Sequence, residues 1–136
     1  MTAGHDPEAA ARQLLRYWSA KDTGQLTRLL HPDAVLTGPL VPGGRAVGSD
    51  AIRAFLDAEN TDRSALPTID RGRYEFMARA RAQVVNVVAL DARAALECEV
   101  AGDAGDALPA ALFVDLHPAA GSIERIALYL DPRRRV

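Results

Sequence analysis

The spacing of hydrophobic residues changes along this chain, from a helical period in the first half to alternation in the second. Residues 7–20 carry apolar side chains three or four positions apart, which is typical of a helix with one buried face. Asp6 and Pro7 precede this stretch and suit a helix N-cap and first turn. The predicted apolar face consists of Ala11, Leu14, Leu15 and Trp18. We therefore expect a first helix from about residue 7 to residue 20.

Two more helices are predicted before residue 60. Asp22 with Gln25 three places later forms a capping-box pattern, so a short second helix should follow it and end by Pro32. A third helix should begin at Ser49 and bury Ile52, Phe55 and Leu56. Glu59 continues that apolar stripe. For residues 60–75 we expect either a loop or a short helix around Tyr74.

The rest of the chain predicts strands. Residues 34–40 form a short apolar run before a turn at "VPGG", and alternation of period two begins after residue 80. Alternating segments occupy residues 83–90, 94–100, 109–116 and 122–130. Helices grouped first and strands grouped last favour an α+β fold, with three N-terminal helices on one face of a curved, mainly antiparallel sheet. We expect one domain over residues 1–136.

Alternation also sorts the strand residues by face, as the last strand, "IERIALYL", shows most clearly. Leu128 should point inward and Arg125 and Tyr129 outward, because neighbouring side chains of a strand point to opposite faces. By the same rule Glu97 and Glu99 share a face, but it is the outer one, which argues against an acid–base pair. The predicted inward set is Leu96, Cys98, Val100, Leu112, Val114, Leu116, Ile126, Leu128 and Leu130.

Composition narrows the possible partners. The 136 residues carry a net charge of −2, which gives no electrostatic reason to expect nucleic acid or an anionic membrane. One cysteine and three scattered histidines do not suggest a metal site, and we expect no cofactor. His31, at a helix-to-strand corner, is expected to be a local hydrogen-bonding residue. The N-terminus lacks an apolar segment, and alanine far outnumbers lysine, so a cytoplasmic bacterial protein is expected.

Three stretches carry a resemblance to a known family: "YWSAKDTGQLTRLLHPDAVLTGP", "VGSDAIRAFL" and "GSIERIALYLDP". Together they resemble the nuclear-transport-factor-two-like (NTF2-like) cone fold, in its SnoaL-like and ketosteroid-isomerase-like branch. The resemblance implies a cone-shaped α+β barrel with an apolar pocket between the helices and the sheet. It also implies a homodimer that pairs through the outer face of the sheet.

The resemblance further implies where catalytic groups would lie. Ketosteroid isomerase has a carboxylate base after the first strand, a tyrosine on the first helix and a protonated acid on a later strand. In this sequence those positions fall on Gly38, Leu14 and Leu112. SnoaL-type cyclases and limonene-epoxide-hydrolase-like enzymes have an aspartate within the last strand, where this chain has Leu128. Neither set of catalytic residues is present, so standard isomerase or hydrolase chemistry is not expected.

Three polar residues remain as catalytic candidates. Glu59 extends a buried helix face, where burial would raise its pKa. Tyr74 could donate a hydrogen bond from a lid, and Tyr17 could do so from the first helix. The predicted pocket lining is Leu14, Trp18, Leu36, Gly38, Phe55, Leu112, Val114 and Leu128.

Two hypotheses follow from these residues. In the first, the protein is a cyclase, isomerase or dehydratase that acts on a hydrophobic polyketide- or polycyclic-type compound with a non-standard acid and base. In the second, it is a non-catalytic dimeric module that binds a ligand or another protein. An open pocket with Glu59 or Tyr74 at its wall would favour the first hypothesis. A cavity filled by Leu14, Leu112 and Leu128 would favour the second.

Overall fold

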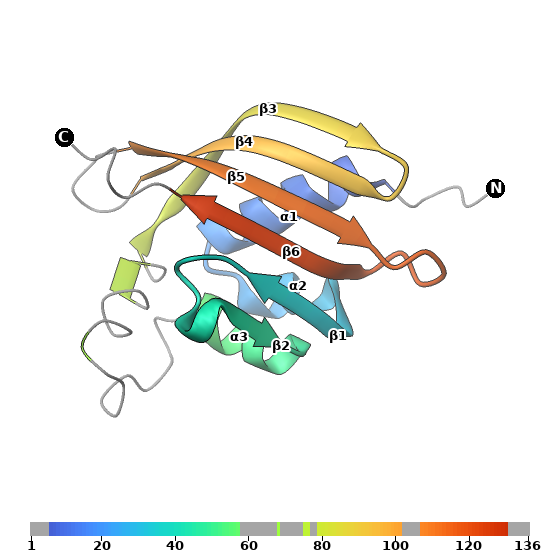
Figure 1. The fold of residues 1–136 in the computed structure, drawn as a ribbon, viewed down its shortest axis with the longest axis horizontal. Coiled ribbons are helices and arrows are strands. Elements are labelled where there is room, and N and C mark those ends of the chain that lie inside the picture. The colour runs from blue at the N-terminus through green and yellow to red at the C-terminus, as the bar shows by residue number, and fades with distance from the viewer. Residues whose placement is uncertain (1–5, 58–67, 69–74, 77–78, 102–106, 131–136) are drawn as a thin grey trace.

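The protein is a curved sheet with helices on one side (Figure 1). The computed structural model describes residues 6–57, 68, 75–76, 79–101 and 107–130. The helices are α1 (Pro7–Ser19), α2 (Thr23–Arg28) and α3 (Ser49–Leu56), with a 3₁₀ turn, η1, at Pro42–Gly44. The strands are β1 (Leu30–Thr37), β2 (Arg45–Val47), β3 (Arg81–Leu90), β4 (Arg93–Ala101), β5 (Ala107–Leu116) and β6 (Ile123–Leu130).

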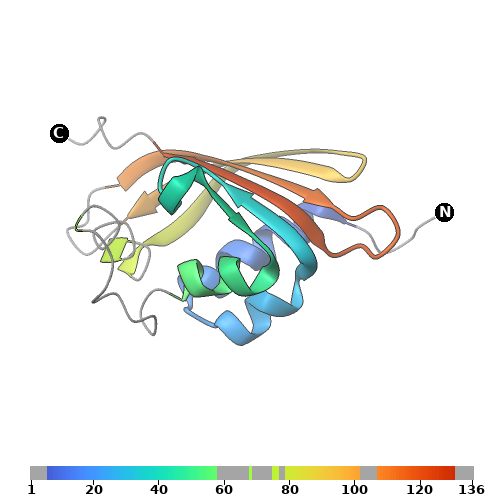
Figure 2. The same ribbon diagram turned by 60° about the horizontal axis from the view of Figure 1, so that its bottom comes forward.

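The six strands form one mixed sheet in the order β2-β1-β6-β5-β4-β3. β1 runs parallel to β6, and the other neighbouring pairs are antiparallel. The sheet curves over the three helices, which lie on its concave side (Figure 2). The predicted α+β class and the mainly antiparallel sheet are therefore confirmed.

Side-chain caps and tertiary hydrogen bonds fix the first helix. The Asp6 carboxylate accepts hydrogen bonds from the backbone N–H groups of Glu8 and Ala9, as the sequence predicts. At the other end, the Ser19 hydroxyl accepts from the backbone N–H of Ala82 at 3.0 Å. Lys21 Nζ donates to the carbonyl of Ala80 at 2.7 Å. These bonds hold the C-terminal end of α1 against the start of β3.

The prediction for the first strand was wrong at its start. We expected the second helix to extend to Pro32 and a strand to begin at residue 34, but α2 ends at Arg28 and β1 begins at Leu30. A proline disfavours the helical conformation of the residue before it, and His31 precedes Pro32, so His31 lies in the strand. The pairing of β1 with β6 is irregular between Leu30 and Val35, and that interval accommodates a proline that cannot donate a hydrogen bond.

Other boundaries differ less. β2 has only three residues and was not predicted, because so short a segment shows no period. β5 begins at Ala107 rather than residue 109, since Ala107 and Leu108 pair with the end of β4. The hairpin between β3 and β4 turns at Asp91 and Ala92 as predicted, and Asp91 has the positive φ of 55° that such turns need.

The assignment of strand faces is confirmed. All members of the predicted inward set are buried except Leu128, which is half-buried and packs against the core. Arg125 and Tyr129 on β6 are exposed on the outer face, as are Glu97 and Glu99 on β4. The hydrophobic core therefore fills the space between the concave side of the sheet and the helices.

Candidate ligand cavity

A small apolar cavity lies inside the cone. Its volume is about 30 Å³, whereas ligand pockets usually measure roughly 300–1,000 Å³. Its walls come from α1, α3 and four strands. The lining residues are Leu14, Leu15, Trp18, Leu36, Leu56, Cys98, Val100, Leu112, Ile126 and Leu128. Large aliphatic side chains thus occupy most of the space that a ligand would need.

The strand register brings the wall together. Leu112 on β5 pairs directly with Leu128 on β6, and Leu36 on β1 pairs with Ile126 on β6. Leu128 lines the cavity and is nevertheless only half-buried, so the cavity approaches solvent beside this side chain. The opposite wall is the apolar face of α1.

Gly38 lies where the backbone of β6 approaches the end of β1 closely. A Cβ added at Gly38 would overlap the carbonyl oxygen of Leu128 and lie 3.2 Å from its carbonyl carbon. The φ of Gly38 is also +154°, a value that side-chain-bearing residues rarely adopt. The resemblance implied a carboxylate base at this position, but the backbones of β1 and β6 approach too closely there for any side chain.

Trp18, whose side chain is one of those that line the cavity, carries a buried polar group. The side chain is 4% exposed, and its Nε1–H has no hydrogen-bond partner in the described part of the chain. Lys21 Nζ lies 4.6 Å from the centre of the Trp18 ring, a cation–π distance. A buried indole N–H usually finds an acceptor, so this unsatisfied donor is unusual.

Cys98 is the only ionisable side chain among the lining residues that the structure describes. Its pKa is raised to about 11, first by burial of the thiol and second by the negative charge of neighbouring Glu97. The thiol therefore stays protonated at neutral pH and is a poor nucleophile. Together, the described lining residues provide neither a general acid nor a general base.

The predicted site residues are only partly brought together. Leu14, Trp18, Leu36, Leu112 and Leu128 line the cavity, whereas Gly38, Phe55 and Val114 do not. Phe55 and Val114 are buried in the surrounding core. Of the catalytic candidates, Tyr17 is half-buried beside the core and is not in the wall.

The other two catalytic candidates, Glu59 and Tyr74, lie outside the described residues. We expected Glu59 to continue the apolar stripe of the third helix. However, α3 ends at Leu56, with Asp57 as its C-cap.

Five lining residues were not predicted as pocket residues: Leu15, Leu56, Cys98, Val100 and Ile126. Each of them had a sequence signal, since each lies on the predicted inward face of its helix or strand. Periodicity shows that such a residue is buried. It does not show whether the residue borders a cavity or the packed core.

Polar side chains outside the cavity form local contacts. Arg93 binds Asp115 across β4 and β5 with two hydrogen bonds, at 2.6 and 3.0 Å, which raise the pKa of Arg93. Arg125 on β6 is the Cα partner of Asp115 on β5. His31 accepts a hydrogen bond from the backbone of Asp33, which confirms its predicted corner role. Its ring stacks on that of His117, 4.7 Å away.

Within the part of the chain that the structure describes, no three His, Cys, Asp or Glu side chains are placed to hold a metal ion. No helix there is long and apolar enough to cross a membrane.

Comparison with known proteins identifies the fold. No protein-family model and no curated protein sequence matches the chain. An NTF2-like protein of unknown function from Cytophaga hutchinsonii superposes with a TM-score of 0.69 at 14% identity, over 98% of this chain and 96% of its own. A proposed SnoaL-like isomerase from Agrobacterium tumefaciens has a TM-score of 0.65 at 17% identity, over 92% and 97%.

A proposed polyketide cyclase from Sinorhizobium meliloti has a TM-score of 0.66 at 19% identity, over 88% of this chain and 93% of its own. Agreement at such low identity shows a shared architecture and leaves the activity open, because this fold carries many functions. The curved sheet, the helices on its concave side and these superpositions agree with one another. The chain has the NTF2-like fold.

Proposed function

We propose that this protein is a non-catalytic, homodimeric module that binds a small apolar molecule inside the cone. The observation that carries the proposal is the chemistry of the cavity wall. Nine of the ten described lining residues are hydrocarbon or indole side chains, and Cys98 is a protonated thiol. Such a wall favours burial of an uncharged apolar group, which gains free energy by leaving water. It offers no group that could move a proton at neutral pH.

The size of the cavity limits any ligand to a compact molecule. A volume of about 30 Å³ is about a tenth of that of the smallest usual ligand pockets, roughly 300 Å³. A polycyclic compound would not fit without large movements of the leucines. The half-buried Leu128 is the side chain whose displacement would admit a somewhat larger ligand.

The catalytic alternative needs an acid or a base at the cavity. In that alternative the protein is a cyclase, isomerase or dehydratase acting on a polyketide- or polycyclic-type compound. Its candidates are Glu59, Tyr74 and Tyr17, and the last of these is not in the cavity wall. We favour the binding module because the described wall lacks proton-transfer groups.

A ligand screen that also recovers the ligand tests both alternatives. Small neutral hydrocarbons and carbonyl compounds are added to the protein, the melting temperature is measured, and each bound compound is identified afterwards by mass spectrometry. We expect a rise in melting temperature for some compounds and recovery of each compound unchanged. Conversion of a bound compound by wild-type protein, abolished in Glu59→Gln or Tyr74→Phe, would establish the catalytic alternative instead.

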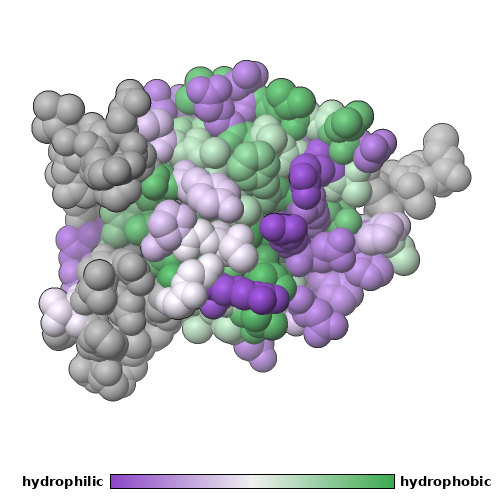
Figure 3. Space-filling view, viewed as in Figure 1, coloured by the Kyte–Doolittle hydropathy of each residue, from purple (hydrophilic) through white to green (hydrophobic). Residues whose placement is uncertain are grey.

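The outer face of the sheet supports the proposed homodimer. Large apolar side chains are exposed there, including Leu90 at 74%, Val88 at 65%, Tyr129 at 48% and Phe113 at 37%. Figure 3 shows this face, with hydrophobic side chains over its upper part and hydrophilic ones toward its right side. Clusters of exposed apolar residues commonly mark protein interfaces.

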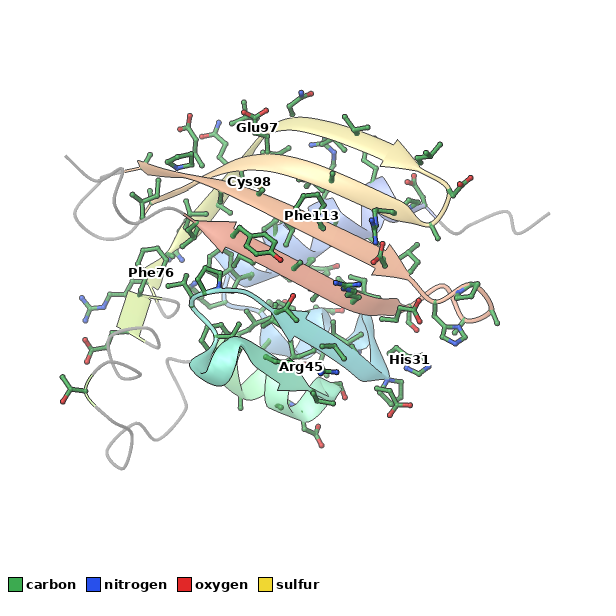
Figure 4. The ribbon with its side chains drawn as sticks, in the orientation of Figure 1. His31, Arg45, Phe76, Glu97, Cys98 and Phe113 are labelled. Atoms are coloured by element: carbon green, nitrogen blue, oxygen red, sulfur yellow. The ribbon has the colours of Figure 1, made fainter. Side chains whose placement is uncertain are left out.

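The register of the strands would allow this face to pack against a second copy of itself. Figure 4 labels Phe113 on β5 and Glu97 on β4. By the strand register, Phe113 lies midway between Glu97 and Arg125 on β6. Glu97 lies on β4 two residues beyond the partner of Phe113 on that strand. Arg125 lies on β6 two residues beyond the partner of Phe113 there, in the opposite direction along the sheet. A two-fold axis that lies in the plane of this face and passes through Phe113 can therefore bring Glu97 of one copy opposite Arg125 of the other. It would pair each Glu97 with the partner's Arg125 and each Phe113 with its copy.

Charge reversal tests this arrangement. Light scattering of the wild type should give twice the 14.6 kDa mass of one chain. Glu97→Arg and Arg125→Glu should each weaken the dimer by about tenfold or more, because like charges in an interface cost several kcal/mol. The double variant should restore it, and Glu124→Arg is a control outside the proposed pair. A monomeric wild type, or a double variant no better than the single ones, would contradict this arrangement.

A further inference from the structure

We infer that the outer face of the sheet holds a second binding site, which takes a small aromatic carboxylate and uses Arg125 as its counter-ion. The site is a hollow of about 220 Å³ that shares no lining residue with the apolar cavity inside the cone. The site itself goes beyond the proposed function, whereas its effect on assembly rests on the proposed homodimer. The lining residues are Arg93, Phe113, Asp115, Arg125, Ala127 and Tyr129.

The hollow exists because a small residue lies among large ones. Ala127 on β6 is the partner of Phe113 on β5. Along its own strand, Ala127 lies between Arg125 and Tyr129, which point to the same face of the sheet. The alanine side chain ends at Cβ, so it leaves a depression between its longer neighbours. A closed cavity of about 150 Å³ is enough to bind benzene, so the hollow has room for one aromatic ring with a short substituent.

The charges of the hollow leave one cation without a partner. Arg93 donates to both carboxylate oxygens of Asp115, at 2.6 and 3.0 Å, so these two charges compensate each other. Within the described residues, the Arg125 guanidinium makes no ion pair, although Asp115 is its register partner. Glu124 lines a different hollow and is not part of this wall. A guanidinium is always charged, and its N–H groups form a fork that matches a carboxylate, so the hollow favours a monoanion.

Two aromatic rings give the hollow an apolar side. The ring centroids of Phe113 and Tyr129 lie 6.2 Å apart, and the ring planes make an angle of 72°. Rings at nearly right angles form a corner, where a third ring can place its face against one and its edge against the other, as aromatic pairs prefer. Both side chains are exposed, so a bound ring would remove apolar surface from water. A ring for this corner and a carboxylate for Arg125 together define the ligand class.

The proposed homodimer uses the same groups. In that dimer, Glu97 of the second copy would bring its carboxylate to Arg125, and Phe113 would pack on its own copy. A bound aromatic carboxylate would take the place of both contacts. A ligand that binds only the monomer shifts the equilibrium toward the monomer. We therefore expect the ligand and the second copy to compete for this face.

Phenylacetate and its neutral amide, phenylacetamide, test the site because they differ mainly in charge. Chemical-shift titration is carried out in Glu97→Gln, which weakens the proposed dimer and leaves the lining of the hollow unchanged. At low salt, phenylacetate should bind about three- to fivefold more tightly than the amide, as expected for one exposed charge pair. Adding Arg125→Gln should remove this preference. Adding Arg45→Gln should not, because Arg45 is an exposed arginine on β2 outside the hollow.

Three results would overturn the site and leave the proposed homodimer standing. The first is a preference for phenylacetate that survives Arg125→Gln. The second is no binding of phenylacetate to Glu97→Gln. The third is acetate, which lacks the ring, binding as tightly as phenylacetate.

Light scattering of the wild type tests the effect on assembly. Phenylacetate should lower the mass from that of a dimer toward the 14.6 kDa of one chain, and phenylacetamide at the same concentration should lower it less. A dimer that binds phenylacetate without dissociating would overturn the competition. A wild type that is monomeric without ligand would refute the homodimer, and the titrations alone would then decide the site.

Discussion

The close approach of β1 and β6 at Gly38 can be tested by a single methyl group. In Gly38→Ala the new Cβ would overlap the carbonyl oxygen of Leu128, which belongs to the backbone and cannot rotate away. The unfavourable φ of +154° should cost about 1–2 kcal/mol. The overlap should add about 1–3 kcal/mol, as overpacking usually does. We therefore expect Gly38→Ala to lower the free energy of unfolding by about 2–5 kcal/mol.

Gly43 provides the matched control. It also has a positive φ, of +74°, but a Cβ there would meet no atom within 4 Å. Gly43→Ala should therefore cost only the conformational part, about 1–2 kcal/mol. Urea unfolding followed by circular dichroism gives both values. In thermal unfolding, each kcal/mol should lower the melting temperature by roughly 4 °C for a chain of this size.

The comparison has a clear negative outcome. If the two glycine variants lose the same stability, the backbone of Leu128 does not restrict position 38, and the explanation for the missing carboxylate is wrong. Gly38→Asp extends the test to the isomerase-like residue. It should be at least as destabilised as Gly38→Ala, because it adds a carboxylate to the same overlap. A stable Gly38→Asp protein would show that the site can hold the base after all.

Three further predictions concern the wall and the turns. Burial raises the pKa of Cys98 to about 11, so as pH rises the thiol ionises in the unfolded chain before it ionises in the folded protein. The stabilising effect of the buried thiol is therefore complete below about pH 9 and is lost as pH rises through about 11. Between pH 8 and pH 11, the free energy of unfolding measured in urea should fall by roughly 2–3 kcal/mol more in wild type than in Cys98→Ala. An equal fall in the two proteins would contradict the assignment. Leu128→Asp should destabilise by roughly 2–4 kcal/mol in chemical denaturation because it places a carboxylate against the apolar cavity. The control Val47→Asp, at an exposed position on β2, should cost less than about 1 kcal/mol; equal losses would mean that position 128 is solvated. His117 Nδ1 accepts from the backbone N–H groups of two turn residues, so His117→Ala should cost about 1 kcal/mol in thermal unfolding, and an equal loss in His117→Asn, which keeps an acceptor, would argue against that role.

The sequence predicted the features that depend on near neighbours in the chain. Alternation in "IERIALYL" placed Leu128 inward and Tyr129 outward, because the pleat of a strand has a fixed period of two. Asp6 and Asp22 were recognisable as caps since each bonds to backbone N–H groups two or three residues away. These patterns sufficed for the fold class, the order of the predicted elements and the buried faces of the last three strands.

Features that depend on distant contacts could not be predicted. Gly38 is restricted by Leu128, which lies on another strand, and the sequence does not show how closely two parallel backbones approach. Leu30 continues an apolar stripe from the second helix, but pairing with Ile123 places it in β1. Trp18 was expected in the pocket from helical spacing, yet the missing acceptor for its N–H depends on every residue packed around the ring.

The three positions that the resemblance matched to catalytic groups, Gly38, Leu14 and Leu112, differ in what a polar side chain there would cost. Leu14 and Leu112 fill the cavity and could each be replaced by a polar residue at the cost of burying it. Position 38 cannot be restored in the same way, because a backbone atom occupies the place of the side chain. A new base would therefore require β1 and β6 to move apart, which breaks their pairing at the adjacent Thr37 and Ala127.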